Sequence, residues 1–136
     1  MRYLLDTNIC IYAIKAQPAS VIARLRSLKA DEVGISVVTA YELWFGVHKS
    51  EHVRKNTAAL EAFLGSLSVL AFEDSDAQEC GKLRAQLERA GTPIGPYDLQ
   101  IAAQARSRGL ILVTNNAAEF RRIPTLTIEN WVARTP

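Results

Sequence analysis

The sequence has few features that would place it outside the ordinary globular proteins. It contains only two cysteines, Cys10 and Cys80, each in an apolar-patterned segment, and two are too few for a disulfide framework. We therefore expect both to be reduced core residues of a cytoplasmic protein. No apolar run approaches the roughly 18 residues of a membrane span, and no basic-then-apolar leader opens the chain. Neither membrane insertion nor export is indicated.

The charge balance is nearly even, because 16 Lys and Arg residues stand against 14 Asp and Glu residues. A net charge of +2 does not by itself identify a nucleic-acid partner. If several acids gather in one pocket, however, the remaining surface is more basic than the total suggests. With 49% hydrophobic residues, no repeat and no low-complexity tract, residues 1–136 are expected to form a single domain.

The apolar spacing alternates between short strand-like runs and longer helical ones. It predicts strands at Tyr3–Leu5, Val33–Val38, Ser68–Phe72, Leu110–Val113 and Leu126–Ile128. It predicts helices at about Asn8–Lys15, Pro18–Leu28, Ala40–Lys49, Val53–Leu67, Asp76–Ala90 and Pro96–Arg108, with Thr39 and Ser75 as N-caps and Gly91 and Gly109 as C-terminal stops. Such alternation indicates an α/β fold with a mainly parallel sheet. In these folds the ligand site lies beyond the carboxyl ends of the strands.

The first expected strand ends directly on an acid, Asp6, with Thr7 and Asn8 opening the next helix. Asp6 is either an N-cap that accepts backbone hydrogen bonds or a carboxylate that needs a partner at the edge of the core. This stretch alone does not separate the two interpretations.

The second expected strand is followed by Glu42. The spacing Thr39-x-x-Glu42 is typical of a capping box, in which Glu42 would only close the start of a helix, and taken alone it favours that structural role. The same spacing also places Glu42 in a first helical turn above a strand's carboxyl end.

The third acid, Asp98, opens the helix that follows Gly95 and Pro96. It shares a face with apolar residues at offsets of three, four and seven, namely Ile101, Ala102 and Ala105. A carboxylate at the head of an apolar stripe points towards the protein. A helix-dipole role for Asp98 remains an alternative.

The fourth place is the segment after Leu110–Val113, which supplies Thr114, Asn115, Asn116 and, one helical turn later, Glu119. Alone, this segment is typical of a turn and cap. Several carboxylates in one pocket would repel one another unless a divalent cation neutralised them. Hard oxygen ligands without Cys or His favour Mg²⁺, with Mn²⁺ as a substitute.

Four segments, LLDTNICIYAIK, TAYELWFGVHKS, IGPYDLQIAAQARSRGL and ILVTNNAAEF, occur in this order and spacing. The chain thereby resembles the PIN-domain ribonucleases and, more narrowly, the VapC toxins of bacterial toxin–antitoxin pairs. The resemblance covers essentially the whole chain. It implies a PIN-like αβα sandwich, with a mainly parallel central sheet flanked by helices.

The resemblance also implies an acidic Mg²⁺ pocket and hydrolysis of RNA, with structured RNAs such as tRNA prominent. By motif, the first three family acids fall on Asp6, Glu42 and Asp98. The fourth often stands where this chain has Asn116, which leaves open whether Asn116 or Glu119 completes the site and whether one or two metals bind. Because of this departure, an alternative is a catalytically impaired RNA-binding or regulatory PIN module.

Other residues are assigned supporting roles. Thr7, Asn8, Thr114 and Asn115 are expected to orient the carboxylates. Arg121, Arg122 and Tyr97 are expected to contact substrate, the arginines through phosphates and Tyr97 by stacking an unpaired base. Tyr97 could equally fill the core. Arg106 and Arg108 are further phosphate candidates, whereas Arg84 and Arg89 are better explained as a solvated helix face.

The resemblance implies two protein partners, a second copy in a homodimer and a cognate VapB-type antitoxin, which together form a higher toxin–antitoxin assembly. The antitoxin would block the pocket with a basic or aromatic segment. The stretch Ala40–Val47 is apolar on several sides, which either contact or deep burial would explain.

Two further interpretations are set aside. His48-Lys49-Ser50-Glu51-His52 matches the inverted zinc-protease pattern, but the segment is polar and no third ligand is recognisable nearby. An aspartyl-phosphate phosphatase would require an acid where Asn8 stands, and a phospho-receiver does not explain Glu42.

Overall fold

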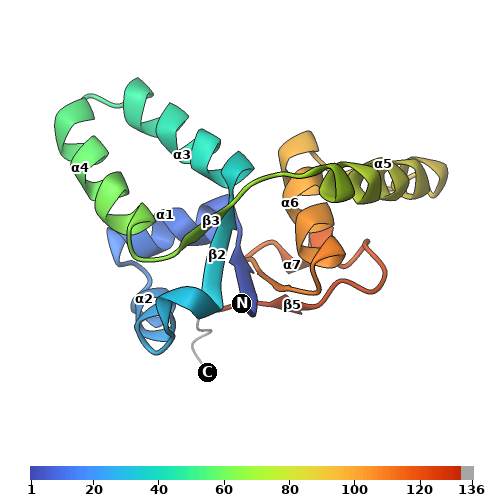
Figure 1. Cartoon of the computed structure of the whole chain (residues 1–136), viewed down its shortest axis with the longest axis horizontal. Helices are drawn as coiled ribbons and strands as arrows, with labels where there is room; N and C mark the ends of the chain where they lie inside the picture. The colour runs from blue at the N-terminus through green and yellow to red at the C-terminus, as the bar shows by residue number, and fades with distance from the viewer. Residues whose placement is uncertain (133–136) are drawn as a thin grey trace.

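The computed structural model describes residues 1–132, which form five strands, seven α-helices and one short 3₁₀ helix (Figure 1). In chain order these are β1 (Tyr3–Leu5), α1 (Thr7–Lys15), α2 (Ala19–Arg26), η1 (Ala30–Glu32), β2 (Val33–Ser36), α3 (Val37–Lys49), α4 (Val53–Leu64), β3 (Ser68–Leu70), α5 (Asp74–Arg89), α6 (Pro96–Ser107), β4 (Ile111–Val113), α7 (Ala117–Phe120) and β5 (Ile128–Glu129). The strands form one sheet in the order β3-β2-β1-β4-β5. Every neighbouring pair is parallel, which confirms the expected α/β class.

Strand β1 lies at the centre of the sheet and separates two apolar cores. Because side chains alternate along a strand, Tyr3 and Leu5 pack with α1 to α4, whereas Leu4 packs with α5 and α6. Figure 1 shows α1 to α4 on one side of the sheet and α5 and α6 on the other. The arrangement is the three-layer sandwich expected from the sequence, and β1 delivers Asp6 to the middle of the sheet's carboxyl edge.

The second strand is shorter than expected. It ends at Ser36 rather than Val38, and α3 begins at Val37 rather than Ala40. The physical reason is that the Ser36 hydroxyl accepts the Val38 N–H at 3.1 Å and caps the helix early. Thr39 is therefore not an N-cap but a buried residue of the first turn.

Other boundaries also shift. Helix α5 begins at Asp74 with Glu73 as its N-cap, so the prediction that Ser75 caps it was wrong. The last strand lies at Ile128–Glu129 instead of Leu126–Ile128, and the four-residue α7 is too short to leave a periodic signal. Gly91 and Gly109 have φ of 73° and 65°, which confirms them as helix stops that use the left-handed region.

Both cysteines are free, but only Cys10 is a core residue. Burial raises the pKa of the Cys10 thiol well above its usual value. Cys80 is partly exposed on α5, which corrects its placement in the core. None of the helices within residues 1–132 has the length and apolar character needed to cross a membrane.

Candidate active site

Asp6 is the first residue after β1 and the N-cap of α1, and its side chain is 4% exposed. Its Oδ1 accepts the Ile9 N–H at 2.9 Å, so the capping role is confirmed. Burial raises the pKa of Asp6, hydrogen bonds from Thr114 and Ile9 oppose the rise, and the negative charge of Glu42 adds to it. Asp6 is thus both a cap and a carboxylate that lies close to another acid.

Glu42 does not close a capping box, because α3 starts too early for Thr39 to be its cap. Instead, the Thr7 hydroxyl donates to Glu42 Oε1 at 2.7 Å and also lies 3.3 Å from Thr39 Oγ1. This contact joins α3 to the residue that directly follows Asp6. Thr7 therefore fixes the position of the Glu42 carboxylate, the contact that its predicted supporting role requires.

Asp98 lies in the first turn of α6, behind Pro96 at the helix start. Its pKa is raised to about 6, first by burial and then by the negative charges of Glu119, Asp6 and Glu42. The dipole of α6 favours an ionised acid here, so the raised pKa shows that burial and the neighbouring acids prevail. Four carboxylates from separate parts of the chain therefore share one electrostatic environment.

The segment after β4 positions the fourth acid, Glu119, through a chain of hydrogen bonds. The buried Thr114 hydroxyl accepts the Asn116 N–H at 2.9 Å, and the Asn116 side-chain amide donates to the Glu119 carboxylate. Asn116 is thereby a partner of Glu119. Asn115 is exposed and its Oδ1 accepts from Asn130 at 3.1 Å, so the structure does not join it to a carboxylate. Asn8 is exposed in the first turn of α1.

The four acids supply the oxygen ligands that a hard divalent cation prefers, but their side chains are not arranged as a ready-made binding site. Within residues 1–132, no three Asp, Glu, His or Cys side chains are grouped closely enough to hold a metal ion. His48, Glu51 and His52 therefore do not form a zinc site in this part of the chain. Glu42 and Glu119 are hydrogen-bonded to Thr7 and Asn116. The donors are nevertheless anionic oxygens, and a cation would relieve the repulsion that raises the pKa of Asp98.

Two of the arginines proposed to contact phosphate lie at the C-terminal end of α6, away from Asp98 in its first turn. Arg106 forms an ion pair with Glu79, and Arg108 pairs with Asp76 at 2.8 Å, so both hold α6 against α5. Sequence reasoning missed these pairs because the partners lie 27 and 32 residues earlier.

The other arginines considered as substrate contacts are more exposed. Arg84 pairs with Glu88 along the exposed face of α5, as expected for a solvated helix. Arg121 is exposed, and Arg122 is exposed and donates to the Pro93 carbonyl at 3.1 Å.

Tyr97 stands beside Asp98 with 42% of its surface exposed, so it does not fill the core. Its ring packs edge-to-face against Tyr41 at 5.7 Å between centroids, and the two hydroxyls are 3.4 Å apart. Helix α3 buries Leu43 and Val47, but Tyr41 and Phe45 are 55% and 58% exposed. Burial therefore explains only one face of the apolar stretch Ala40–Val47.

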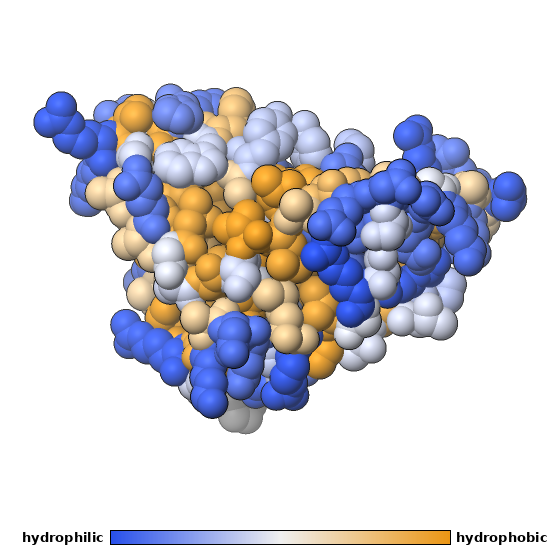
Figure 2. All heavy atoms as spheres, in the orientation of Figure 1, coloured by the Kyte–Doolittle hydropathy of each residue, from blue (hydrophilic) through white to orange (hydrophobic). Residues whose placement is uncertain are grey.

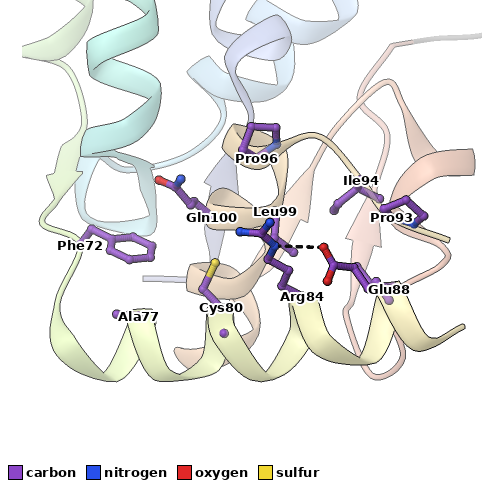
Figure 3. A pocket seen from close by; sticks show the side chains of 12 residues that line it. Phe72, Ala77, Cys80, Arg84, Glu88, Pro93, Ile94, Pro96, Leu99 and Gln100 are labelled. Carbon is purple, nitrogen blue, oxygen red and sulfur yellow. Dashed lines mark hydrogen bonds and ion pairs between the residues drawn. The ribbon is translucent and has the colours of Figure 1, made fainter. Parts of the chain in front are cut away.

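A cavity of about 570 Å³ lies between α5 and α6 (Figure 3). Phe72, Cys80, Leu99 and Gln100 line it together with the Arg84–Glu88 ion pair, and none of the four acids does.

A second groove of about 250 Å³ runs between α1, α3 and α4. Its lining is mainly apolar and includes Ile11, Leu43, Leu60 and the acid Glu42. No pattern in the sequence indicated the first cavity. The apolar residues spaced along α1, α3 and α4 were the pattern that could have indicated the second groove.

Comparisons with known proteins agree with this fold. The PIN domain family model matches residues 3–126. The chain is 46% identical over 131 residues to the tRNA(fMet)-specific endonuclease VapC of Shigella flexneri, covering 96% of this chain and 98% of that protein. It is 43% identical over 132 residues to the ribonuclease VapC2 of Haemophilus influenzae, covering 97% of this chain and 99% of that protein.

A solved structure is equally similar. DNA-bound VapBC from Salmonella typhimurium superposes with a TM-score of 0.92 at 44% identity, covering 96% of this chain and 98% of that one. The family model spans most of the chain, and the relatives and the structure match it nearly end to end. The chain therefore belongs to the PIN-domain family and, within it, to the VapC proteins.

Proposed function

We propose that this protein is a Mg²⁺-dependent endoribonuclease, the toxin of a type II toxin–antitoxin pair acting in the cytoplasm. The observation that carries the proposal is the shared environment of Asp98, Glu119, Asp6 and Glu42 at the carboxyl edge of the sheet. Two similar proteins are named as an endonuclease and a ribonuclease, and the superposed structure is a VapBC assembly.

Asp6 and Asp98 would hold the Mg²⁺ ion, with Glu42 completing the site and Mn²⁺ as a substitute. A bound divalent ion polarises the scissile phosphate and makes its water a stronger nucleophile at neutral pH. Thr7 holds Glu42 in place, and Thr114 does the same for Asp6. In-line attack by water leaves a 5′-phosphate and a 3′-hydroxyl.

Glu119 is the fourth acid of this proposal, and Asn116 is the residue that positions it. The hydrogen bond from the Asn116 amide to the Glu119 carboxylate supports this division, because an amide supplies no negative charge of its own. The chain thus departs from the family pattern at residue 116 and keeps an acid one helical turn later.

The substrate class is structured RNA, with tRNA first among the candidates because one relative is named for tRNA(fMet). The exposed Tyr97 ring lies next to Asp98 and would stack an unpaired base at the pocket. Arg121 and Arg122 follow α7 closely in the chain and would contact the flanking phosphates.

The antitoxin would dock in the groove between α1, α3 and α4. The groove is mainly apolar, and Glu42 contributes to its wall. An antitoxin segment with apolar side chains and a basic residue would fill the groove and neutralise Glu42, which blocks the pocket. The homodimer is supported by α3, whose outer face exposes Val37, Tyr41 and Phe45 at intervals of four residues.

The direct test is to incubate antitoxin-free protein with total cellular RNA, in Mg²⁺ or in EDTA, and to map the 5′ ends. We expect discrete cuts that require Mg²⁺ and disappear in Asp6→Asn. The matched control is Asp31→Asn, because Asp31 is an exposed acid on η1, before the opposite end of β2. Absence of metal-dependent cuts from the folded wild-type protein would contradict the proposal.

The alternative function, an impaired RNA-binding PIN module, is favoured by one observation, the amide Asn116 in place of an acid. It predicts that the wild-type protein binds RNA but cleaves none with Mg²⁺ or Mn²⁺. The same incubation, combined with a binding measurement, distinguishes the two functions.

A further inference from the structure

The turn between α3 and α4 concentrates positive charge. Residues 48–55, His48-Lys49-Ser50-Glu51-His52-Val53-Arg54-Lys55, contain three formal cations against one acid. This short segment therefore carries as much net positive charge as the whole chain, whose total is +2. All three cations are exposed. Figure 2 shows hydrophilic side chains projecting at the α3–α4 end of the molecule, at the upper left.

These cations have no acidic partner in the described part of the chain. The ion pairs within residues 1–132 use Arg24, Arg84, Arg106 and Arg108, and none uses Lys49, Arg54 or Lys55. Arg106 and Arg108, by contrast, are paired with acids of α5. Exposed, unpaired cations clustered in one place instead indicate a surface that attracts an anionic partner.

The turn is also joined to the acidic pocket by α3 itself. Glu42 and Lys49 are seven residues apart on this helix, which places them about 10 Å apart along its axis. Between them, the Lys49 ammonium lies over the Phe45 ring at 5.7 Å, and His48 stacks on Trp44 at 6.0 Å. These ring contacts hold the Lys49 and His48 side chains against α3, on the stretch of helix that follows Glu42.

We propose that the α3–α4 turn is a second RNA-contact surface, in which Lys49, Arg54 and Lys55 bind phosphates of the substrate beyond the cleaved bond. The inference rests on the proposed function for its class of partner. An extended or structured RNA held at the acidic pocket is polyanionic, and a cluster about 10 Å along α3 lies within its reach. These contacts add affinity without reading sequence, so they favour large RNAs over short ones.

The test measures binding of a fluorescein-labelled RNA stem–loop by anisotropy over a range of salt concentrations. The protein is the full chain carrying Asp6→Asn, so that the RNA stays intact. The test variant adds Lys49→Gln, Arg54→Gln and Lys55→Gln. The matched control adds Arg26→Gln, Lys29→Gln and Lys82→Gln, which remove three other exposed cations on α2, before η1 and on α5.

We expect the turn variant to bind the stem–loop about tenfold or more weakly. The slope of log K against log salt should become shallower by roughly 0.7–0.9 for each phosphate that the variant no longer binds. The control should keep most of its affinity. Equally weakened binding in both variants would reduce the effect to net charge and overturn the proposal. Unchanged RNA binding in the turn variant would also overturn it.

Failure of this inference is distinguishable from failure of the proposed function. If the wild-type protein cleaves RNA with Mg²⁺ while the turn variant binds the stem–loop like its control, only the turn assignment falls. If the wild-type protein cleaves nothing but the turn variant selectively loses RNA affinity, the nuclease assignment falls and the contact surface stands.

Discussion

At Asp6, one side chain has a structural role and, in the proposed function, a chemical one. Its Oδ1 caps α1 through Ile9, while burial and the charge of Glu42 disfavour its ionised form. An N-cap requires only an acceptor, whereas a metal ligand of this kind requires the charge. A substitution by Asn therefore removes only the charge, whereas a substitution by Ala removes both the charge and the cap.

We predict that Asp6→Asn keeps the cap and melts no lower than the wild-type protein in EDTA, because it removes a charge that the folded state disfavours. Asp6→Ala should lose about 1 kcal/mol of stability with the cap. Both variants should lose RNA cleavage by at least a hundredfold. Thermal unfolding and single-turnover cleavage, measured on the same samples, check this. Retained cleavage in Asp6→Asn would show that Asp6 is only a cap.

Glu119 and Asn116 are also expected to have separable roles, since Glu119 supplies a negative charge and Asn116 supplies only a hydrogen bond. We expect Glu119→Gln to lower the cleavage rate at limiting Mg²⁺ by about tenfold or more and to raise the Mg²⁺ concentration needed for half-maximal rate. Asn116→Ala should have a smaller effect, because it frees Glu119 without removing its charge. Mg²⁺ titrations of both variants give the comparison. A larger defect in Asn116→Ala would make the amide the fourth ligand instead.

At the scale of elements, the starts of helices depended on contacts that the sequence does not display. Strand β2 stops at Ser36 because a serine caps α3, although Thr39 offered an equally good capping pattern. Glu42 matched a capping box but meets Thr7, 35 residues earlier. Local spacing predicted the strands and the longer helices, whereas the role of Glu42 depended on a partner far away in the sequence.

Helices α5 and α6 are joined by the ion pair between Asp76, which is fully buried, and Arg108. Burial would raise the pKa of Asp76, but hydrogen bonds from Arg108 and the Glu73 N–H outweigh it, so the net pKa is lowered. A lowered carboxyl pKa means that the unfolded chain binds more protons. The stability this pair provides is thus present above the ordinary Asp pKa of about 4 and is lost as the pH falls below it.

We predict that Asp76→Asn lowers the free energy of unfolding by about 1–3 kcal/mol at neutral pH. The difference from the wild-type protein should shrink as the pH falls below about 4. Urea unfolding at a series of pH values measures both effects, with Asp31→Asn as the exposed control. A cost that is the same in strong acid and at neutral pH would exclude the ion pair as its source.

At the scale of the whole molecule, the class of fold and the convergence of the acids were predictable, because parallel strands bring their carboxyl ends to one edge. Asp6 and Asp98 were located from strand and helix boundaries alone. The sequence did not predict the pairing of Arg106 with Glu79 or the cavity beside Cys80, since each depends on how α5 and α6 pack. Asn116 was recognised as a departure, but its hydrogen bond to Glu119 required the fold.

The acidic pocket should make the stability of the whole protein depend on divalent metal. We expect saturating Mg²⁺ to raise the melting temperature of the wild-type protein by several degrees, since about 100-fold excess over Kd contributes roughly 2.7 kcal/mol. Asp98→Asn should show little rise. Differential scanning calorimetry in Mg²⁺ and in EDTA checks this. An equal rise in both proteins would place the stabilising ion elsewhere.

The central claim is that the pocket directs water, and not a group of the RNA, at the scissile phosphate. The most direct measurement is the chemistry of the product ends, using an RNA substrate and the same RNA with a 2′-deoxy sugar at the cleaved nucleotide. The account predicts 5′-phosphate and 3′-hydroxyl ends, and continued Mg²⁺-dependent cleavage of the deoxy substrate. A 2′,3′-cyclic phosphate, with no cleavage of the deoxy substrate, would contradict it.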